Sequence, residues 1–320
     1  ERAGLFDVSH MGQPIVSRQK AAALFSRLTP SPFANTPNGR AKYTVLTNER
    51  GGIIDDLIIT RMTQDKFFVV FNAGRKDVDI AWMKKNLPAG VTFEELSGNA
   101  LVALQGPKAE SVLAKEIPDA GVANIPYMSM KEGKWKGAPV FISRLGYTGE
   151  DGFEISVPAA KASEFWNALL ANTDVKPVGL AARDSLRLEM GYPLYGHDLA
   201  ENISPVEASL SWVISKGHDG FIGASVILPQ MASGTARKRV GVKLEAGGIA
   251  REGAPVYAGD EHVGMLTSGG FSPSLKAAIG QGYIGTKVEV EVRGKRIAAS
   301  IHALSFMPAH TKSSTLKKAS

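Results

Sequence analysis

Short runs of β-branched and aromatic residues, separated by turn-forming residues, dominate the first part of the chain and predict strands. Three such runs follow one another, at residues 43–47, 53–61 and 66–72. Because short turns join them, we expect an antiparallel meander. Residues 75–87 then change to helical spacing, which predicts a helix with Val78, Trp82 and Met83 on its buried side.

Both patterns recur up to about residue 190. They predict strands at residues 100–105, 140–144 and 153–157, and helices at residues 108–116, after Pro158, and at residues 180–190. Pro158 suits the first turn of a helix, since the backbone N–H that proline lacks has no partner there. The first two-thirds of the chain is therefore expected to mix strands and helices.

Beyond about residue 230 the helical spacing gives way to short alternating runs broken by glycine-rich turns. The predicted strands are residues 240–244, 255–258, 262–267 and 288–293. Such a pattern is typical of a small all-β barrel or sandwich. Residues 231–235 are the expected boundary between the two regions.

One glycine-rich motif, Gly-x-Gly-x-x-Gly at residues 280–285, resembles a dinucleotide-binding fingerprint. That fingerprint needs a helix directly after it, so that the helix N-terminus meets the pyrophosphate. Here the strand pattern of residues 288–292 follows instead. We interpret the motif as a turn.

Composition limits the possible chemistry. The 320 residues suggest two or three domains, and the absence of cysteine excludes disulfides, thiolate nucleophiles and cysteine-bound metal clusters. The six histidines lack metal-ligand spacing, so no metal is expected. No serine nucleophile elbow or Walker loop occurs, and no apolar run approaches the roughly 20 residues of a membrane span, so we expect no membrane association.

The net charge of +6 favours an acidic partner or an anionic substrate. Basic residues are dispersed, and the only dense patches are residues 237–239 and 312–318. We therefore do not expect nucleic-acid binding.

Two adjacent carboxylates, Asp55 and Asp56, interrupt an otherwise apolar strand, Gly-Gly-Ile-Ile-Asp-Asp-Leu-Ile-Ile-Thr, at residues 51–60. Side chains alternate along a strand, so the two carboxylates lie on opposite, apolar faces. At least one of them should then be paired, hydrogen-bonded or functional, because an unpaired buried charge is costly. The alternative is a strand end at which both meet water. The pattern does not choose between Asp55 and Asp56.

Three further polar residues are candidates, each with a plainer alternative. Glu154 follows a glycine-rich turn and shares its strand face with Ser156, a face that solvent could also occupy. Arg183 stands in the first half of a predicted helix, where surface charges are common, and Asn72 ends a strand, where an N-terminal cap would serve equally. Together they suit recognition of a neutral heterocycle rich in hydrogen-bonding groups.

These same segments, in this order, resemble the T-protein family of the glycine cleavage system. The matching stretches are residues 4–12, 51–57, 71–74, 104–107, 146–154, 179–188, 194–196, 204–207, 267–269 and 272–275. The resemblance implies an α+β, multidomain fold with antiparallel sheets and helices around a central folate-binding opening. It implies a discontinuous first domain (1–14 and 113–232), a second α+β domain (15–112) and a C-terminal β-barrel (233–320).

The resemblance also implies an activity. T-proteins take the aminomethyl group from the lipoyl arm of the H-protein, a typically acidic partner, and pass its one-carbon unit to tetrahydrofolate with release of ammonia. The family's catalytic carboxylate matches Asp56. Its folate-contacting positions match Glu154, Arg183, Asn72, Tyr43, Tyr147 and Met11.

The chain also departs from the family pattern. Family members usually carry some tens of residues before the position of Glu1, so an incomplete first domain is expected. After Pro308 the sequence diverges, and no folate role is assigned to Thr311 or Lys312. The sequence does not decide between bacterial cytoplasm and mitochondrial matrix.

Related families provide the alternatives. One is a folate-dependent demethylase, or a sarcosine- or dimethylglycine-oxidising enzyme, which would add a flavin domain. Another is a non-catalytic folate-binding protein of the same fold, which supports iron–sulfur assembly. That group has a Lys-Gly-Cys-Tyr-type motif, whereas residues 216–223 here contain no cysteine.

Overall fold

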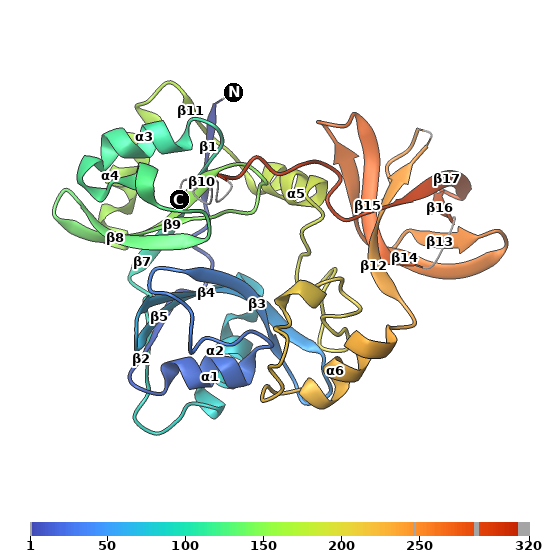
Figure 1. Cartoon of the computed structure of the whole chain (residues 1–320). Helices are drawn as coiled ribbons and strands as arrows, with labels where there is room; N and C mark the ends of the chain where they lie inside the picture. The colour runs from blue at the N-terminus through green and yellow to red at the C-terminus, as the bar shows by residue number, and fades with distance from the viewer. Residues whose placement is uncertain (1, 246, 285–287, 313–320) are drawn as a thin grey trace, which may run out of the picture.

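Two open sheets and a closed barrel surround the centre of the protein in the computed structural model, which describes residues 2–245, 247–284 and 288–312 (Figure 1). The five-stranded sheet has the order β3-β4-β5-β2-β6, with β2 at Pro14–Ser17, β3 at Ala41–Thr47, β4 at Ile53–Thr63, β5 at Lys66–Phe71 and β6 at Thr92–Glu95. The predicted antiparallel meander is β3-β4-β5.

The six-stranded sheet has the order β11-β1-β7-β10-β9-β8. Its strands are β1 at Ala3–Asp7, β7 at Asn99–Gln105, β8 at Ser129–Trp135, β9 at Ala138–Arg144, β10 at Gly152–Pro158 and β11 at Val175–Pro177. Only the β1–β11 pair is parallel. The strands predicted at residues 140–144 and 153–157 are β9 and β10, which pair with each other across the glycine-rich turn.

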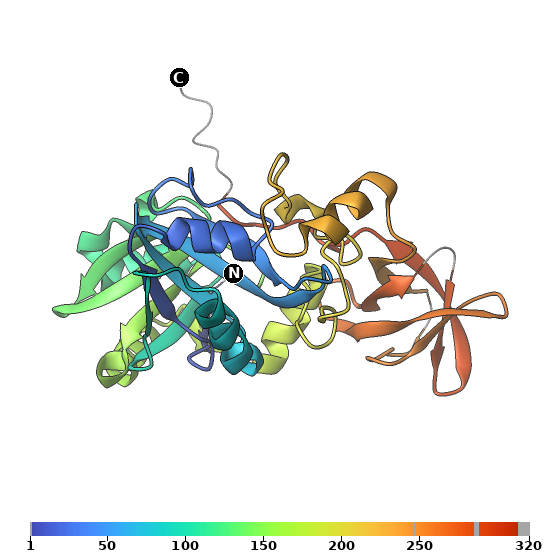
Figure 2. The ribbon, with the colours of Figure 1, turned by 90° about the horizontal axis from the view of Figure 1, so that it is seen from below.

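Six β-strands close into the C-terminal barrel, in the order β12-β15-β14-β13-β16-β17. They are β12 at Lys238–Leu244, β13 at Pro255–Ala258, β14 at Glu261–Ser272, β15 at Ala277–Ile284, β16 at Val288–Val292 and β17 at Lys295–His302. The barrel stands to one side of the two sheets (Figure 2). The expected α+β fold with a C-terminal all-β barrel is confirmed.

Helices cover the outer faces of the two sheets. The α-helices are α1 at Ala21–Leu28, α2 at Lys76–Lys85, α3 at Ala109–Glu116, α4 at Ala159–Leu170, α5 at Leu180–Glu189 and α6 at Ala224–Ser233. Single 3₁₀ turns are η1 at Ala73–Arg75, η2 at Pro118–Ala120, η3 at Val122–Asn124 and η4 at Ser211–Val213. Within the described residues, none of these helices is long and apolar enough to cross a membrane.

The hydrophobic clusters define four layers. Leu24 of α1 and Met83 of α2 pack on one face of the five-stranded sheet, and Val112 of α3 and Phe165 of α4 pack on one face of the six-stranded sheet. The inner faces meet through a cluster that includes Phe68 of β5 together with β7 residues. Alternation along each strand therefore sends every second side chain into the space between the sheets.

The buried face of α2 differs from the prediction. Met83 is buried, but Val78 is 39% exposed and Trp82 only partly buried, so the expected position of Val78 was wrong. Asp79 is fully buried instead, one turn before Met83. The hydrophobic pattern could not predict this buried face, because one of its two buried residues, Asp79, is acidic.

The expected turn at residues 280–285 was also wrong. Residues 280–284 are part of β15, while Gly285 lies outside the described residues. A Cβ atom on Gly282 would stand 2.4 Å from the carbonyl oxygen of Met265, so glycine is needed where β14 approaches closely. The register of β14 shifts between Leu266 and Ser268, which marks a bulge at this place.

The two sheets do not follow the domain ranges that the resemblance implied. β7 falls within the expected second domain (15–112), yet it pairs with β1 and β10 of the other sheet. The segment after Leu199, expected in the first domain, hydrogen-bonds to the five-stranded sheet and its loops. The backbone pairs are Ile53–Ile203, Pro30–Ser215 and Arg27–Ile222.

A buried polar network around Asp198 joins the barrel to the rest of the chain. Its carboxylate accepts hydrogen bonds from Arg187 Nη1 (2.9 Å), Ser268 Oγ (2.8 Å), Thr267 Oγ1 (2.5 Å) and Gln281 Nε2 (3.2 Å). The end of the described chain returns from the barrel to α3 beside the six-stranded sheet, where Lys312 Nζ lies 2.9 Å from Glu110 Oε2 (Figure 1). Of the basic patch 312–318, only Lys312 is among the described residues.

We predict that Asp198→Ala lowers the free energy of unfolding by roughly 3–5 kcal/mol, because Arg187 loses its buried counter-charge. Asp184→Ala removes the other carboxylate that pairs with Arg187, but Asp184 is 58% exposed. That control should cost less than about 1 kcal/mol. Equal losses in urea unfolding of the two variants would contradict a central role for Asp198.

Candidate active site

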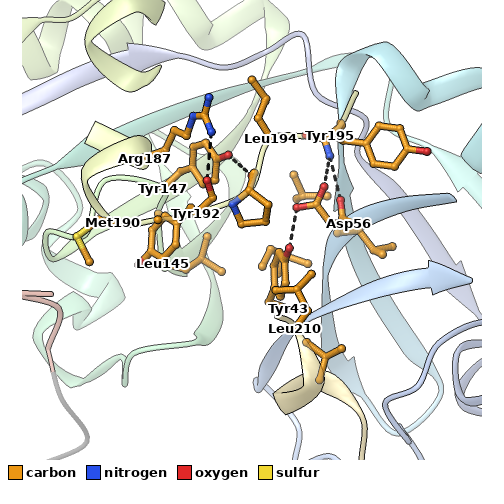
Figure 3. A pocket seen from close by; sticks show the side chains of 18 of the residues that line it. Tyr43, Asp56, Leu145, Tyr147, Arg187, Met190, Tyr192, Leu194, Tyr195 and Leu210 are labelled. Atoms are coloured by element: carbon orange, nitrogen blue, oxygen red, sulfur yellow. Dashed lines mark hydrogen bonds between the residues drawn. The ribbon is translucent and has the colours of Figure 1, made fainter. Parts of the chain in front are cut away.

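A cavity of about 1520 Å³ lies where the two sheets, α5 and the segments leading to the barrel meet. The seven residues selected from the sequence all line it, namely Met11, Tyr43, Asp56, Asn72, Tyr147, Glu154 and Arg183. They come from different segments, and Figure 3 shows Tyr43 and Asp56 on one side of the cavity, with Tyr147 and Tyr192 on the other. The fold therefore brings the sequence candidates together. What each of them does stays a prediction.

The side-chain amide of Asn72 binds both adjacent carboxylates. Its Nδ2 donates to Asp55 Oδ1 (2.9 Å), to Asp56 Oδ1 (2.8 Å) and to the Asp56 carbonyl oxygen (3.1 Å), while its backbone N–H donates to Asp55 Oδ2 (3.1 Å). Asn72 occupies the cap position of η1, but its side chain makes no capping hydrogen bond. Asn72 thus stands at an N-terminal cap position, as the plainer interpretation expected, but its side chain binds the two carboxylates instead of capping.

The two carboxylates face opposite ways, as alternation predicts. Asp55 is fully buried, whereas Asp56 lines the cavity and is partly buried. The alternative in which both meet water at a strand end is thus excluded. Asp56 is the carboxylate that a bound molecule could contact.

Tyr43 supplies a second donor to Asp56. Its hydroxyl donates to Asp56 Oδ2 over 3.0 Å, as the dashed line in Figure 3 marks. Burial, followed by the negative charge of Asp55, raises the pKa of Asp56 to about 7, although the hydrogen bonds from Tyr43 and Asn72 act in the opposite direction. Asp56 thus changes its charge near neutral pH.

Glu154 and Arg183 form a second polar element across the cavity. Glu154 is 6% exposed, so the solvated strand face considered above was wrong. Its Oε1 stands 3.9 Å from Arg183 Nη2, too far for a hydrogen bond, and burial raises the Glu154 pKa while Arg183 lowers it. Within the described residues Arg183 Nη1 is buried without a hydrogen-bond partner. The pair therefore has hydrogen-bonding capacity to offer a bound molecule.

Aromatic rings form much of the remaining wall. Tyr147 stacks on Tyr192, with ring centroids 5.6 Å apart, and the Arg183 guanidinium lies 5.0 Å from the Tyr147 ring centroid. The Tyr147 hydroxyl donates to the carbonyl of Pro193, which fixes the ring. Such walls suit a flat, partly apolar molecule.

Sequence reasoning missed several lining residues. Trp212 is 67% exposed at the cavity and stacks on Tyr43, with 5.4 Å between the ring centroids. Tyr192 and Tyr195 lie on the segment after α5, and Arg239 reaches the cavity from β12. The three aromatic residues lie outside the α-helices and β-strands, and Arg239 was noticed only as part of the basic patch 237–239. Only a cluster of aromatics between residues 192 and 212 could have suggested their role.

The described residues contain no candidate metal site. Over residues 2–245, 247–284 and 288–312, no three His, Cys, Asp or Glu side chains group as metal ligands. The lining instead combines carboxylates, an amide, a guanidinium and aromatic rings. Such a lining suits a planar molecule rich in hydrogen-bonding groups.

Comparison with known proteins identifies the family of this chain. Residues 1–218 match the family model of the GCVT N-terminal domain, and residues 237–307 match the glycine cleavage T-protein C-terminal barrel domain. The chain belongs to the glycine cleavage T-protein family. The resemblance noted from the sequence is confirmed.

Individual relatives agree with the family models. The mitochondrial aminomethyltransferase of Dictyostelium discoideum is 40% identical over 98% of this chain and 84% of the relative. An aminomethyltransferase of Exiguobacterium sibiricum is 39% identical over 93% of this chain and 84% of the relative. The crystal structure of the glycine cleavage system aminomethyltransferase T from Bartonella henselae has a TM-score of 0.90 at 39% identity, covering 96% of this chain and 87% of that one.

Proposed function

We propose that Asp56, Asn72, Glu154 and Arg183 bind tetrahydrofolate in the cavity, and that ionised Asp56 assists transfer of the one-carbon unit. By its family the chain is an aminomethyltransferase of the glycine cleavage system, and that family uses tetrahydrofolate as a substrate. In this reaction the aminomethyl group leaves a lipoyl sulfur, ammonia is released and the carbon becomes the methylene group of 5,10-methylenetetrahydrofolate.

The lining of the cavity fits a reduced folate. A pterin is flat and presents an amino-pyrimidinone edge, which carboxylates can read through paired hydrogen bonds. Glu154 and Arg183 Nη1 have unused hydrogen-bonding capacity, and the Tyr147–Tyr192 stack offers a flat apolar wall. Tyr43 and Met11 also line the cavity and would pack against the ring systems.

The position of Asp56 carries the proposal. Two donors, Tyr43 and Asn72, hold its carboxylate in the cavity wall and favour its ionised form. When bound, tetrahydrofolate supplies the nitrogen that takes up the methylene carbon, and positive charge develops as that bond forms. An ionised Asp56 would stabilise this charge and orient the acceptor. Proton abstraction is not required first, because an amine nucleophile already has its lone pair.

We predict that Asp56→Asn lowers kcat/KM for methylenetetrahydrofolate formation by roughly 100- to 1000-fold, since the amide keeps the shape but removes the charge. Folate binding, measured by calorimetry, should persist. Asp260→Asn, on the exposed barrel surface, is the matched control and should leave turnover unchanged. Near-normal turnover of Asp56→Asn would reject this role. Sulfonium and N-methyl donors, assayed alongside, address the demethylase alternative.

The pH dependence of kcat/KM should follow the ionisation of Asp56. We predict that kcat/KM rises with pH through an apparent pKa of about 7, because the active form is the carboxylate. Tyr43→Phe removes a hydrogen bond that lowers this pKa, so the acid limb should move to higher pH. Tyr257→Phe, in the barrel, is the control and should leave the limb in place. If Tyr43→Phe left the acid limb of the pH profile in place, the assignment of that limb to Asp56 would be contradicted.

The lipoylated H-protein is the proposed donor, and charge supports its encounter with this chain. The chain has a net charge of +6, and the apolar side chains of Trp212 and Leu180 are exposed at the cavity. H-proteins are typically acidic, so electrostatic steering toward this basic chain follows. The compartment would be the cytoplasm in a bacterium or the mitochondrial matrix in a eukaryote.

The salt concentration should affect the KM values of the two substrates differently. We predict that raising the salt concentration from about 0.05 to 0.5 M increases the KM for the H-protein several-fold, since screening weakens attraction between exposed charges. The KM for tetrahydrofolate should change by less than about twofold, because its contacts are buried. Equal changes in both constants would count against steering.

A further inference from the structure

The first turn of α2 buries a carboxylic acid for which the proposed function gives no role. Asp79 has no exposed surface, and its carboxyl group faces that of Asp55. In the described part of the chain, neither Asp79 oxygen has a hydrogen-bond partner. A carboxylate in such a position would be a buried charge without compensation.

The contact between Asp79 and Asp55 requires a proton. Two carboxylates that touch repel each other, so one of them must be protonated and donate. Asp55 already accepts two hydrogen bonds from Asn72, through Oδ2 from the backbone N–H and through Oδ1 from Nδ2. Asp55 is thus engaged as an acceptor with both oxygens, and Asp79 is the group left to donate.

The charged groups that face Asp79 do not provide another solution. Asp55 and Asp56 approach from β4 and are both acidic, and Tyr195 faces the same cluster from the segment after α5. Arg75 of η1 is the cation nearby, but its Nε donates to the Ile54 carbonyl and its Nη2 to Glu201. Its hydrogen bonds therefore go elsewhere.

We infer that Asp79 is held protonated, donates a hydrogen bond to Asp55, and so acts as a positioning residue for Asp56 through Asn72. The inference rests on the proposed function of Asp56. The chain of contacts runs from Asp79 to Asp55, from Asp55 to the Asn72 amide, and from that amide to the cavity carboxylate.

Two consequences follow for Asp56. A donor behind Asp55 keeps that carboxylate in place, and Asp55 in turn orients Asn72 toward Asp56. Protonation also keeps a third negative charge away from the pair, so that Asp56 can still ionise in the working range of pH. Burial, and next the charge of Asp55, raise the pKa of Asp79 to about 10, although the N-terminus of a helix favours a negative charge.

Substitutions at position 79 separate donation from packing. Asp79→Asn retains an N–H donor for Asp55, so kcat/KM should stay within about threefold of the wild type. Asp79→Leu keeps similar volume without a donor, and we expect a loss of roughly tenfold to a hundredfold in kcat/KM. Because Asn72 then holds Asp56 less well, the acid limb should also move to higher pH. Equal loss in both variants would overturn the inference.

Thermal stability gives a readout without turnover. In the unfolded chain Asp79 loses its proton near pH 4, whereas the folded protein keeps it until about pH 10, so the wild type loses stability as pH rises across this window. Asp79→Asn carries no such proton. Its Tm should therefore be similar to that of the wild type near pH 4 and rise above it progressively toward pH 9.

Asp77→Asn is the matched control, because Asp77 is exposed in the same first turn of α2. Its Tm difference from the wild type should not grow with pH. A flat difference for Asp79→Asn as well would refute the protonated pair, even if Asp79→Leu failed to fold. If the pH-dependent difference appeared while Asp56→Asn retained full turnover, the pair would stand and the proposed role of Asp56 would fall.

Discussion

One amide, that of Asn72, holds two neighbouring carboxylates which would otherwise repel each other across β4. Asp55 is fully buried and Asp56 lines the cavity, and the amide donates to both. Asp55 depends on this donor and on its contact with Asp79, while Asp56 depends on it and on Tyr43. The chemistry of the cavity depends on this arrangement, because it decides where the negative charge lies.

The layered architecture explains why the site forms where it does. Inner faces of the two sheets meet through hydrophobic residues, and the cavity opens beyond that contact, where Asp56 projects from one sheet and Glu154 from the other. The segment after α5 and the barrel complete the wall, and the Asp198 network fixes the barrel to α5. Arg187 belongs to this network and also lines the cavity, so the packing of the barrel and the shape of the site are linked.

Local patterns predicted most of the elements and failed where tertiary contacts override them. Strand alternation predicted opposite faces for Asp55 and Asp56, but only the fold shows which one meets the cavity. The helical pattern selected Val78, since a buried acid such as Asp79 carries no hydrophobic signal and is stable only beside Asp55. Tyr192, Tyr195 and Trp212 lie outside the α-helices and β-strands, where no periodic pattern marks them, so the sequence could not bring them to the cavity.

A crystal structure with bound 5-formyltetrahydrofolate, a stable analogue, would show directly whether Asp56 contacts the pterin. We expect the pterin to lie against the Tyr147–Tyr192 wall, with one carboxylate oxygen of Asp56 within hydrogen-bonding distance of the pterin ring system. Arg183 Nη1, which has no partner among the described residues, should also gain one in the complex. A structure in which Asp56 points to bulk water, with the folate bound elsewhere, would contradict the account.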